Sequence, residues 1–256
     1  MKQPFQKKTV IISGGLGDIG RALAWEFGSL GASIALGDLR DSSTMTPWLK
    51  KMTRHRIRWH YTKVDVSQYE AVCSWVETVE NEMGPPDIII PNAATVTLAS
   101  IHQLTAEQWT RELRVNLDGA FHLAKAATER LVARRKPGKV LFIGSWAADH
   151  IHAHIPAYCV SKAGLRMLCR CLALELAPSG ILVNELAPGS VNAGLSRQLQ
   201  QQKPDLRKEA ARRIPLKRLI SPEEVAWQAA HLCHPENQNM TGSSNVTQFA
   251  WLRLTI

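Results

Sequence analysis

A glycine-rich stretch near the start of the chain, residues 13–20 (Ser-Gly-Gly-Leu-Gly-Asp-Ile-Gly), restricts the possible folds more than any other feature. It follows Thr9–Ile12, a short, continuously apolar run that is typical of a strand buried on both faces. Gly31 ends the helical pattern that comes next, which is formed by Ile19, Leu23, Phe27 and Leu30. A strand, a glycine turn and a helix in this order place free backbone N–H groups where a pyrophosphate can bind.

The second predicted strand, Ser33–Gly37, ends at an acidic residue, Asp38, eighteen residues after Gly20. A carboxylate there can hold the ribose 2′- and 3′-hydroxyls of NAD and repel the 2′-phosphate of NADP. Arg40 keeps NADP as the less favoured alternative. We therefore predict NAD as the cofactor. The residues of this unit that we expect to contact it are Gly14, Leu16, Gly17, Asp18, Ile19 and Asp38.

Short apolar runs alternate with helical patterns along the rest of the chain. Sequences typical of capped helix starts occur at Ser67, Thr105 and Ser221. Five further strands are predicted, at 57–61, 87–90, 139–143, 181–183 and 245–248. This order predicts a single α/β domain over residues 1–256, with a Rossmann-type, doubly wound, mainly parallel sheet of about seven strands flanked by helices. We expect the polar segment 192–215 to be a flap that covers the substrate.

Ser145, Tyr158 and Lys162 form the chemical centre of the sequence. Ser145 follows an apolar run that is typical of a strand, and Tyr158 and Lys162 stand four apart at the start of a helical pattern. That spacing puts the phenol and the ammonium on one helix face, where both could meet the hydroxyl at the strand end. A tyrosine and a lysine four apart are, on their own, more often an ordinary pair on a helix surface.

A chemical argument explains why these three side chains belong together. The pKa of a free tyrosine is about 10, so the phenol is a poor base at neutral pH. A nearby ammonium favours the phenolate, and a pKa near 7 requires about 4 kcal/mol of differential stabilisation. A tyrosine tuned in this way can take the proton of an alcohol or return it to a carbonyl. Ser145 could hydrogen-bond the same oxygen.

Composition restricts the location and the partners. The chain is 45% apolar and 21% charged, as in ordinary globular proteins, and its longest apolar runs are too short to span a membrane. It shows no signal-peptide pattern, and its five cysteines form no Cys-x-x-Cys pair, so we expect a cytoplasmic protein with free thiols and no membrane partner. The net charge of +9 comes from scattered basic clusters without a nucleic-acid motif, so nucleic acid is not an expected partner.

Over about residues 7–248 the sequence resembles the short-chain dehydrogenase/reductase family. The glycine stretch corresponds to the family's Thr-Gly-x-x-x-Gly-x-Gly pattern. The other matching pieces, in chain order, are Asp65-Val66, Asn92-Ala-Ala, Val115-Asn-Leu-Asp-Gly119, Ser145, Tyr158-x-x-x-Lys162 and Pro188-Gly-Ser-Val191. The resemblance implies an oxidoreductase that acts on a small alcohol or ketone. It also implies a homo-oligomer, a tetramer or a dimer, formed through the helices of Asn116 and Tyr158.

The family's roles carry over to the matching positions. Tyr158 would be the general acid/base, Ser145 would orient the substrate oxygen, and Lys162 would bind the nicotinamide ribose and lower the pKa of Tyr158. Asn116 would distort its helix and hold a water molecule that relays protons to Lys162. The other cofactor contacts implied are those of Asp65 and Val66 with the adenine, of Asn92 on the adenosine side and of Val191 with the carboxamide. Tyr158, Pro188 and Gly189 are also implied to contact the cofactor.

Three departures from the family pattern affect the cofactor site. Asp18 occupies a glycine position and would repel a pyrophosphate, unless its side chain turns away and caps the helix. Ala193 stands where a hydroxyl is expected, and Thr247–Ala250 replaces the usual Asp-Gly-Gly. None of these changes touches the proton-transfer residues.

The substrate is indicated only by a histidine-rich segment after Ser145. His150, His152 and His154 alternate there, and with Trp146 they are expected to border the substrate pocket rather than to bind a metal. Polar donors at this border suit a sugar, a polyol or a hydroxy acid, with Ser145, Trp146, His152 and Tyr158 as contacts. Two alternatives stay open: an NADPH-dependent 3-oxoacyl-carrier-protein-type reductase, and a dinucleotide-binding protein without catalytic activity.

Overall fold

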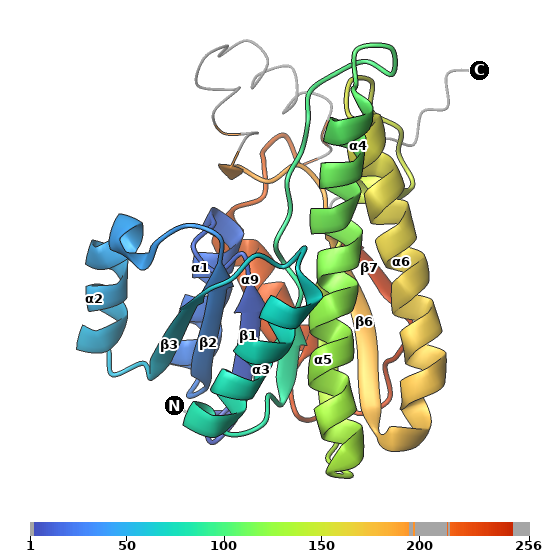
Figure 1. Cartoon of the computed structure of the whole chain (residues 1–256). Coiled ribbons are helices and arrows are strands. Elements are labelled where there is room, and N and C mark those ends of the chain that lie inside the picture. The colour runs from blue at the N-terminus through green and yellow to red at the C-terminus, as the bar shows by residue number, and fades with distance from the viewer. Residues whose placement is uncertain (1–2, 195–196, 198–213, 215, 248–256) are drawn as a thin grey trace.

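A seven-stranded parallel sheet forms the centre of the molecule (Figure 1). The computed structural model describes residues 3–194, 197, 214 and 216–247. The strand order is β3-β2-β1-β4-β5-β6-β7, and every neighbouring pair is parallel. The strands are β1 (Thr9–Ser13), β2 (Ser33–Asp38), β3 (Trp59–Lys63), β4 (Ile88–Ile90), β5 (Gly138–Ile143), β6 (Ile181–Pro188) and β7 (Ser244–Thr247).

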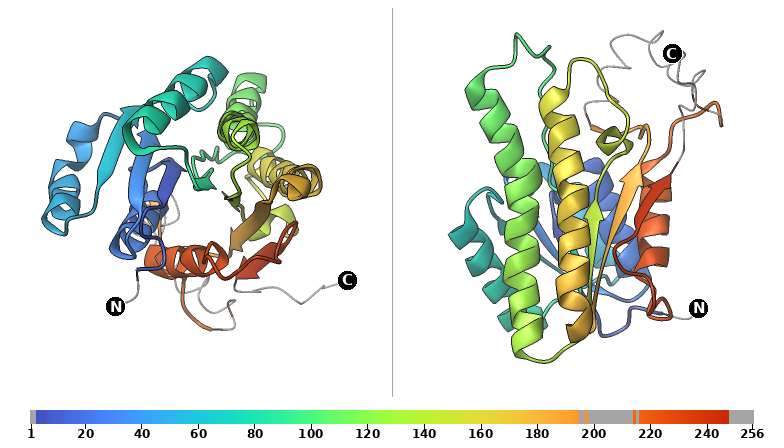
Figure 2. Two further views of the ribbon diagram at one scale, coloured as in Figure 1. Left: turned by 90° about the horizontal axis from the view of Figure 1, so that it is seen from below. Right: turned by 90° about the vertical axis from the view of Figure 1, so that its right-hand side faces the viewer.

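Helices cover both faces of this sheet (Figure 2). The longer helices described are α1 (Asp18–Ser29), α2 (Thr46–Arg54), α3 (Tyr69–Met83), α4 (Ala106–Leu113), α5 (Gly119–Ala133), α6 (Pro156–Leu176) and α9 (Pro222–Leu232). On one face α1 packs beside α9, and on the other α3 packs beside α5, with α6 over β6. Two apolar cores result, one on each face of the sheet. The predicted doubly wound fold is therefore confirmed.

Most strand and helix positions agree with the prediction, and the differences have local causes. Strand β3 begins two residues later than predicted, at Trp59. Strand β6 runs beyond Val183 to Pro188, because Asn184 and Glu185 are buried with hydrogen-bond partners and continue the ladder between β5 and β7. Where the chain is described, it contains no helix with the length and apolar character to cross a membrane. The predicted flap at 192–215 lies largely outside the described residues.

The predicted capping box at Ser67 is wrong, whereas the other two form. The Thr105 and Ser221 side chains each accept a hydrogen bond from the backbone N–H of the third residue of α4 or α9. In both cases the side chain of that third residue accepts the backbone N–H of Thr105 or Ser221 in return. Helix α3 instead begins at Tyr69 and has no side-chain cap. The Ser67 N–H donates to the Asp65 carboxylate at 2.9 Å, which forms a local turn in place of the box.

Candidate active site

The glycine turn between β1 and α1 is closely packed against the backbone around it. Gly14 has a φ of +64°, and a Cβ atom there would lie 2.8 Å from the Cα of Ala93. A Cβ atom at Gly20 would lie 2.2 Å from the Gly14 carbonyl oxygen, so α1 can approach the turn only with glycine at this position. Gly17 is the N-cap of α1, and Leu16 and Ile19 flank it. This tight turn at a helix N-terminus fits the pyrophosphate of a dinucleotide.

Asp38 lies beside this turn at the end of β2. Its carboxylate accepts the Leu16 N–H at 3.0 Å and the Arg40 N–H at 3.1 Å. The Arg40 guanidinium also donates to it, from Nε at 3.1 Å. The structure thus brings together the predicted ribose-binding carboxylate and the turn. It also pairs Arg40 with Asp38, which neutralises the cation that would favour NADP.

Asn92 connects β4 to the same turn. Its Nδ2 donates to the carbonyls of Ser13 and Gly14, at 2.9 and 3.2 Å. The Ser13 hydroxyl in turn accepts the N–H groups of Asn92 and Ala93, at 3.0 and 3.1 Å. The Asn92 side chain thus holds two strand ends together, and its contact on the adenosine side stays a prediction. Sequence reasoning missed the part played by Ser13.

Asp18 does not cap α1, so the cap that the sequence left open as an alternative does not form. It is the first residue of the helix, and its side chain pairs with Arg21 at 2.5 Å. The other carboxylate oxygen accepts the Gly194 N–H at 2.8 Å and lies 3.5 Å from the Arg197 guanidinium. Burial acts to raise the pKa of Asp18, but the Gly194 hydrogen bond and the two arginines outweigh it and lower the pKa. These partners balance the negative charge that would otherwise repel a pyrophosphate.

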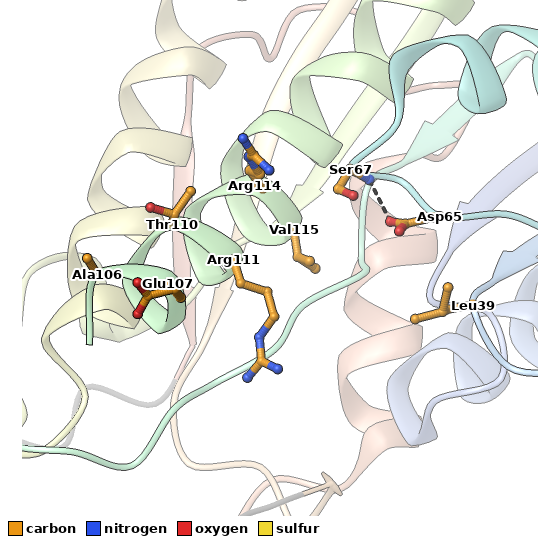
Figure 3. A pocket seen from close by; sticks show the side chains of 9 residues that line it. All are labelled: Leu39, Asp65, Ser67, Ala106, Glu107, Thr110, Arg111, Arg114 and Val115. Atoms are coloured by element: carbon orange, nitrogen blue, oxygen red, sulfur yellow. Dashed lines mark hydrogen bonds between the residues drawn. The ribbon is translucent and has the colours of Figure 1, made fainter. Parts of the chain in front are cut away.

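Asp65 lines a pocket of about 480 Å³ between the end of β3 and helix α4 (Figure 3). The pocket is lined by Leu39, Asp65, Ser67, Ala106, Glu107, Thr110, Arg111, Arg114 and Val115. In Figure 3 the Arg111 side chain extends from α4 toward the side that carries Leu39. Val66, which follows Asp65, is buried and packs on Gly119. The pocket lies where the resemblance places the adenine.

Asn116 interrupts the long helix predicted after Thr105. Residues Arg114–Asp118 form a π-helical segment between α4 and α5, and Asn116 is buried within it. Its side chain accepts the Thr95 N–H at 2.8 Å and donates to the Thr95 carbonyl at 2.9 Å. It also donates to the Ser161 hydroxyl at 3.1 Å, and this hydroxyl donates to the Tyr158 carbonyl. The helix distortion implied by the resemblance is present, and it connects Asn116 to the helix of Tyr158.

Ser145, Tyr158 and Lys162 converge where β5 meets α6. Ser145 is buried at the end of β5, and its hydroxyl accepts the Ala147 N–H at 3.1 Å. Lys162 is 2% exposed, and its ammonium donates to the Ile143 carbonyl at 2.9 Å. The same ammonium lies 5.5 Å from the centroid of the Tyr158 ring. The three groups predicted from spacing therefore share one site.

Burial has the largest effect on the pKa values of Tyr158 and Lys162. Burial raises the pKa of the Tyr158 phenol, a hydrogen bond with the Ser145 side chain opposes this, and the charges of Glu112 and Cys159 raise the pKa further. Burial lowers the pKa of Lys162 to about 8, against the opposing effect of Glu185. The lowering of the Tyr158 pKa by Lys162 stays a prediction.

Trp146 and His152 adjoin Ser145. Trp146 follows it in a short 3₁₀ helix, packs against Ile214, and lies edge-on to the His152 ring at 4.8 Å between centroids. The buried Nε2 of His152 has no hydrogen-bond partner within the described ranges, and burial lowers the pKa of this imidazole. No group of three His, Cys, Asp or Glu side chains in the described part of the chain could hold a metal ion.

The end of β6 and the residues that follow it lie at the same edge of the sheet. Pro188 ends β6, the Gly189 N–H donates to the Thr247 carbonyl at 3.0 Å, and Val191 pairs with Ile220. The ends of β1, β4, β5 and β6 thus meet at the carboxyl edge of the sheet, the edge at which open parallel sheets bind ligands.

Sequence reasoning missed a buried ion pair beneath Ser145. Arg166 of α6 donates from Nε to the fully buried Glu185 of β6 at 2.7 Å. It also pairs with Asp149 and donates to the Ser145 carbonyl at 3.4 Å. Gly144 lies directly on Glu185, because a Cβ atom there would be 1.9 Å from the carboxylate. Arg166 stands four residues after Lys162, so helical spacing could have placed it on the same face.

Known proteins match nearly the whole chain. A family model described as "Enoyl-(Acyl carrier protein) reductase" matches residues 15–247. "Glucose 1-dehydrogenase 2" of Bacillus subtilis is 30% identical over 93% of this chain and 92% of that protein. "3beta-hydroxysteroid dehydrogenase 1" of Eggerthella lenta is 29% identical over 95% and 93%. The crystal structure of NAD⁺-bound xylitol dehydrogenase has a TM-score of 0.89 at 25% identity and covers 95% of this chain and 98% of that one.

A parallel sheet with a glycine turn and a serine, tyrosine and lysine at its carboxyl edge defines a dinucleotide-dependent oxidoreductase. The chain belongs to the short-chain dehydrogenase/reductase family. The family assignment made from the motifs is thereby confirmed.

Proposed function

We propose that this chain interconverts a secondary alcohol and its ketone, with NAD as the hydride carrier and Tyr158 as the general acid/base. The observation that carries the proposal is the convergence of Tyr158, Ser145 and Lys162 at the carboxyl edge of the sheet, next to the glycine turn. The dinucleotide would supply one piece of chemistry, hydride transfer.

The side chains would handle the proton and the substrate oxygen. In the oxidative direction the hydroxyl proton passes to the Tyr158 oxygen as the carbinol C–H bond breaks. Ser145 holds the same substrate oxygen by a hydrogen bond, so the reacting carbon is oriented toward the nicotinamide side of the site. The ammonium of Lys162, beside the Tyr158 ring, stabilises the phenolate. In the reductive direction Tyr158 returns the proton to the carbonyl oxygen.

A sugar, a polyol or a related hydroxy acid is the substrate class that we propose. The unpartnered Nε2 of His152, beside Trp146, offers a polar contact for a second hydroxyl group. Matched proteins are named as dehydrogenases of glucose and of xylitol, which are polyhydroxylated, and another as one of a hydroxysteroid, which is not. A screen of polyols, sugars, hydroxy acids and hydroxysteroids with NAD tests this choice, and turnover of the steroid alone would contradict it.

Replacing Asp38 with alanine should weaken NADH binding about 10- to 100-fold, since a hydrogen bond to a charged group contributes about 1.5–3 kcal/mol. The affinity for NADPH should fall less, or rise, because the charge that repels the 2′-phosphate is gone and Arg40 is released from its ion pair. Fluorescence titration of the wild type and Asp38→Ala with both cofactors measures this ratio. Asp41→Ala, which removes an exposed carboxylate that only caps a turn, is the matched control.

The outcomes separate the alternatives. Unchanged NADH affinity in Asp38→Ala removes this carboxylate from the cofactor site. A wild type that binds NADPH far more tightly favours the carrier-protein-type reductase. A wild type that binds neither cofactor favours a role without catalysis.

We also propose that two or more copies associate through α5 and α6. Val160, Met167 and Leu174 are 49%, 56% and 83% exposed and recur every seven residues on α6, and Phe121 of α5 is 39% exposed. Apolar side chains repeated at this spacing form one stripe along the helix, which is suited to a second copy. Sedimentation equilibrium should therefore give a dimer or a tetramer, and a monomer at micromolar concentration rules this interface out.

A further inference from the structure

Glu112 is a buried carboxyl group that the proposed mechanism does not use. It is 0% exposed and is the one buried residue of α4. Its Oε2 accepts the Thr97 N–H at 2.9 Å. Its Oε1 and the Thr97 hydroxyl are buried, and neither lies in good hydrogen-bond geometry with a partner among the described residues. Burying a carboxyl group costs free energy, and an apolar side chain would fill this position without that cost.

The position of Glu112 connects it to Asn116. The two residues are four apart, so they lie on one helix face, one turn from each other. Asn116 binds the backbone of Thr95, and Glu112 binds the backbone of Thr97. Together they hold alternate residues of the chain that leaves β4, which we call the threonine segment (Thr95–Thr97).

The same pair of side chains reaches Tyr158. Asn116 donates to the Ser161 hydroxyl, and Ser161 donates to the Tyr158 carbonyl at 2.8 Å. The charge of Glu112 acts on the phenol itself, whose pKa it raises. Among the residues that the structure describes, the other charged or titratable groups near the phenol are Cys159 and Lys162, both from α6. Burial also raises the pKa of Glu112, against the opposing effects of Thr97 and of Arg111.

We propose that Glu112 is a positioning residue for the proposed reaction, which holds the threonine segment against α6, the helix that carries Tyr158. The inference rests on the proposed function of Tyr158. Two consequences are expected when Glu112 is replaced. Loss of the carboxyl oxygen frees the Thr97 N–H, and loss of the charge alone makes the phenol easier to ionise.

Glu112→Gln separates these two effects, because the amide keeps an oxygen for the Thr97 N–H and carries no charge. The chain has three tyrosines, so ¹³C labelling of their ring Cζ atoms gives three signals, and Tyr158→Phe identifies one of them. In Glu112→Gln the Tyr158 signal should titrate at lower pH, by about half a unit or more. The signals of Tyr61 and Tyr69 should not move. Glu82→Gln, which removes an exposed carboxylate from α3, is the matched control.

Steady-state kinetics supply the second readout. The pH profile of kcat/KM should shift to lower pH in Glu112→Gln, in the same direction as the NMR titration. Glu112→Leu should lower kcat about tenfold, because the Thr97 N–H loses its acceptor. Glu112→Gln keeps an acceptor for this N–H, so it should not show the tenfold loss. A Tyr158 titration in Glu112→Gln that matches those of the wild type and Glu82→Gln overturns the inference. If the wild type oxidises no alcohol, the proposed function fails, but the NMR titration still decides the role of Glu112.

Discussion

Replacing Tyr158 with phenylalanine should lower turnover about 10²–10⁴-fold, which is the usual contribution of a positioned general acid or base. The change removes one oxygen atom from a side chain that lies against Ser145 and the Lys162 ammonium. In the proposed mechanism Tyr158 takes the substrate proton, while Lys162 donates to the Ile143 carbonyl and acts through the phenol. Steady-state assays of the wild type and Tyr158→Phe with the substrate found in the screen measure the effect.

Cofactor binding provides the control for this experiment. The glycine turn and Asp38 come from β1, α1 and β2, so NADH affinity should stay within about threefold in Tyr158→Phe. Tyr69→Phe should keep full turnover, because that phenol lies at the start of α3 beside His122. Turnover of Tyr158→Phe within tenfold of the wild type would assign proton transfer to another group.

The features that were predictable from the sequence depend on residues that lie close together in the chain. Tyr158 and Lys162 lie four apart on a helix, so their shared face follows from spacing alone. The glycine turn lies between a strand and a helix that can both be read locally. The parallel arrangement of the strands then follows from the alternation of strands and helices, since parallel strands need crossover connections. The position of the site at the carboxyl edge follows from that arrangement.

Contacts between residues distant in sequence were not predictable. Asp18 meets Gly194, 176 positions away, and this contact supplies the neutralising partner that no local pattern indicates. The Asn92 amide fits between two strand ends that only the folded sheet brings together, so its hydrogen bonds to the glycine turn could not be predicted. The capping box at Ser67 failed for the opposite reason, since an acceptor two residues away competed for the same N–H group.

The buried pair of Arg166 and Glu185 is the feature that sequence patterns conceal most completely. A glutamate within a strand and an arginine on a helix both read as surface residues, yet Glu185 is fully buried and Arg166 is 7% exposed. Each explains the burial of the other. Arg166 also donates to the Ser145 carbonyl, so the pair supports the strand end that carries the Ser145 hydroxyl.

Arg166→Met should therefore destabilise the protein by about 3–5 kcal/mol, because it leaves the Glu185 carboxylate buried without its partner. For a chain of this size the midpoint of thermal unfolding should fall by roughly 10 °C. Calorimetry or denaturant unfolding measures the change. Arg218→Met is the matched control, since its ion pair with Glu224 is exposed and such pairs contribute about 0–1 kcal/mol.

The double variant Arg166→Met/Glu185→Leu separates the charge from the packing. Replacing both partners with apolar groups removes the buried charge, so most of the lost stability should return. Turnover should not return with it, because neither methionine nor leucine can donate to the Ser145 carbonyl or bind Asp149. A double variant as unstable as Arg166→Met would show that packing around Gly144 matters more than the charge. A double variant with full turnover would show that Ser145 keeps its position without the ion pair.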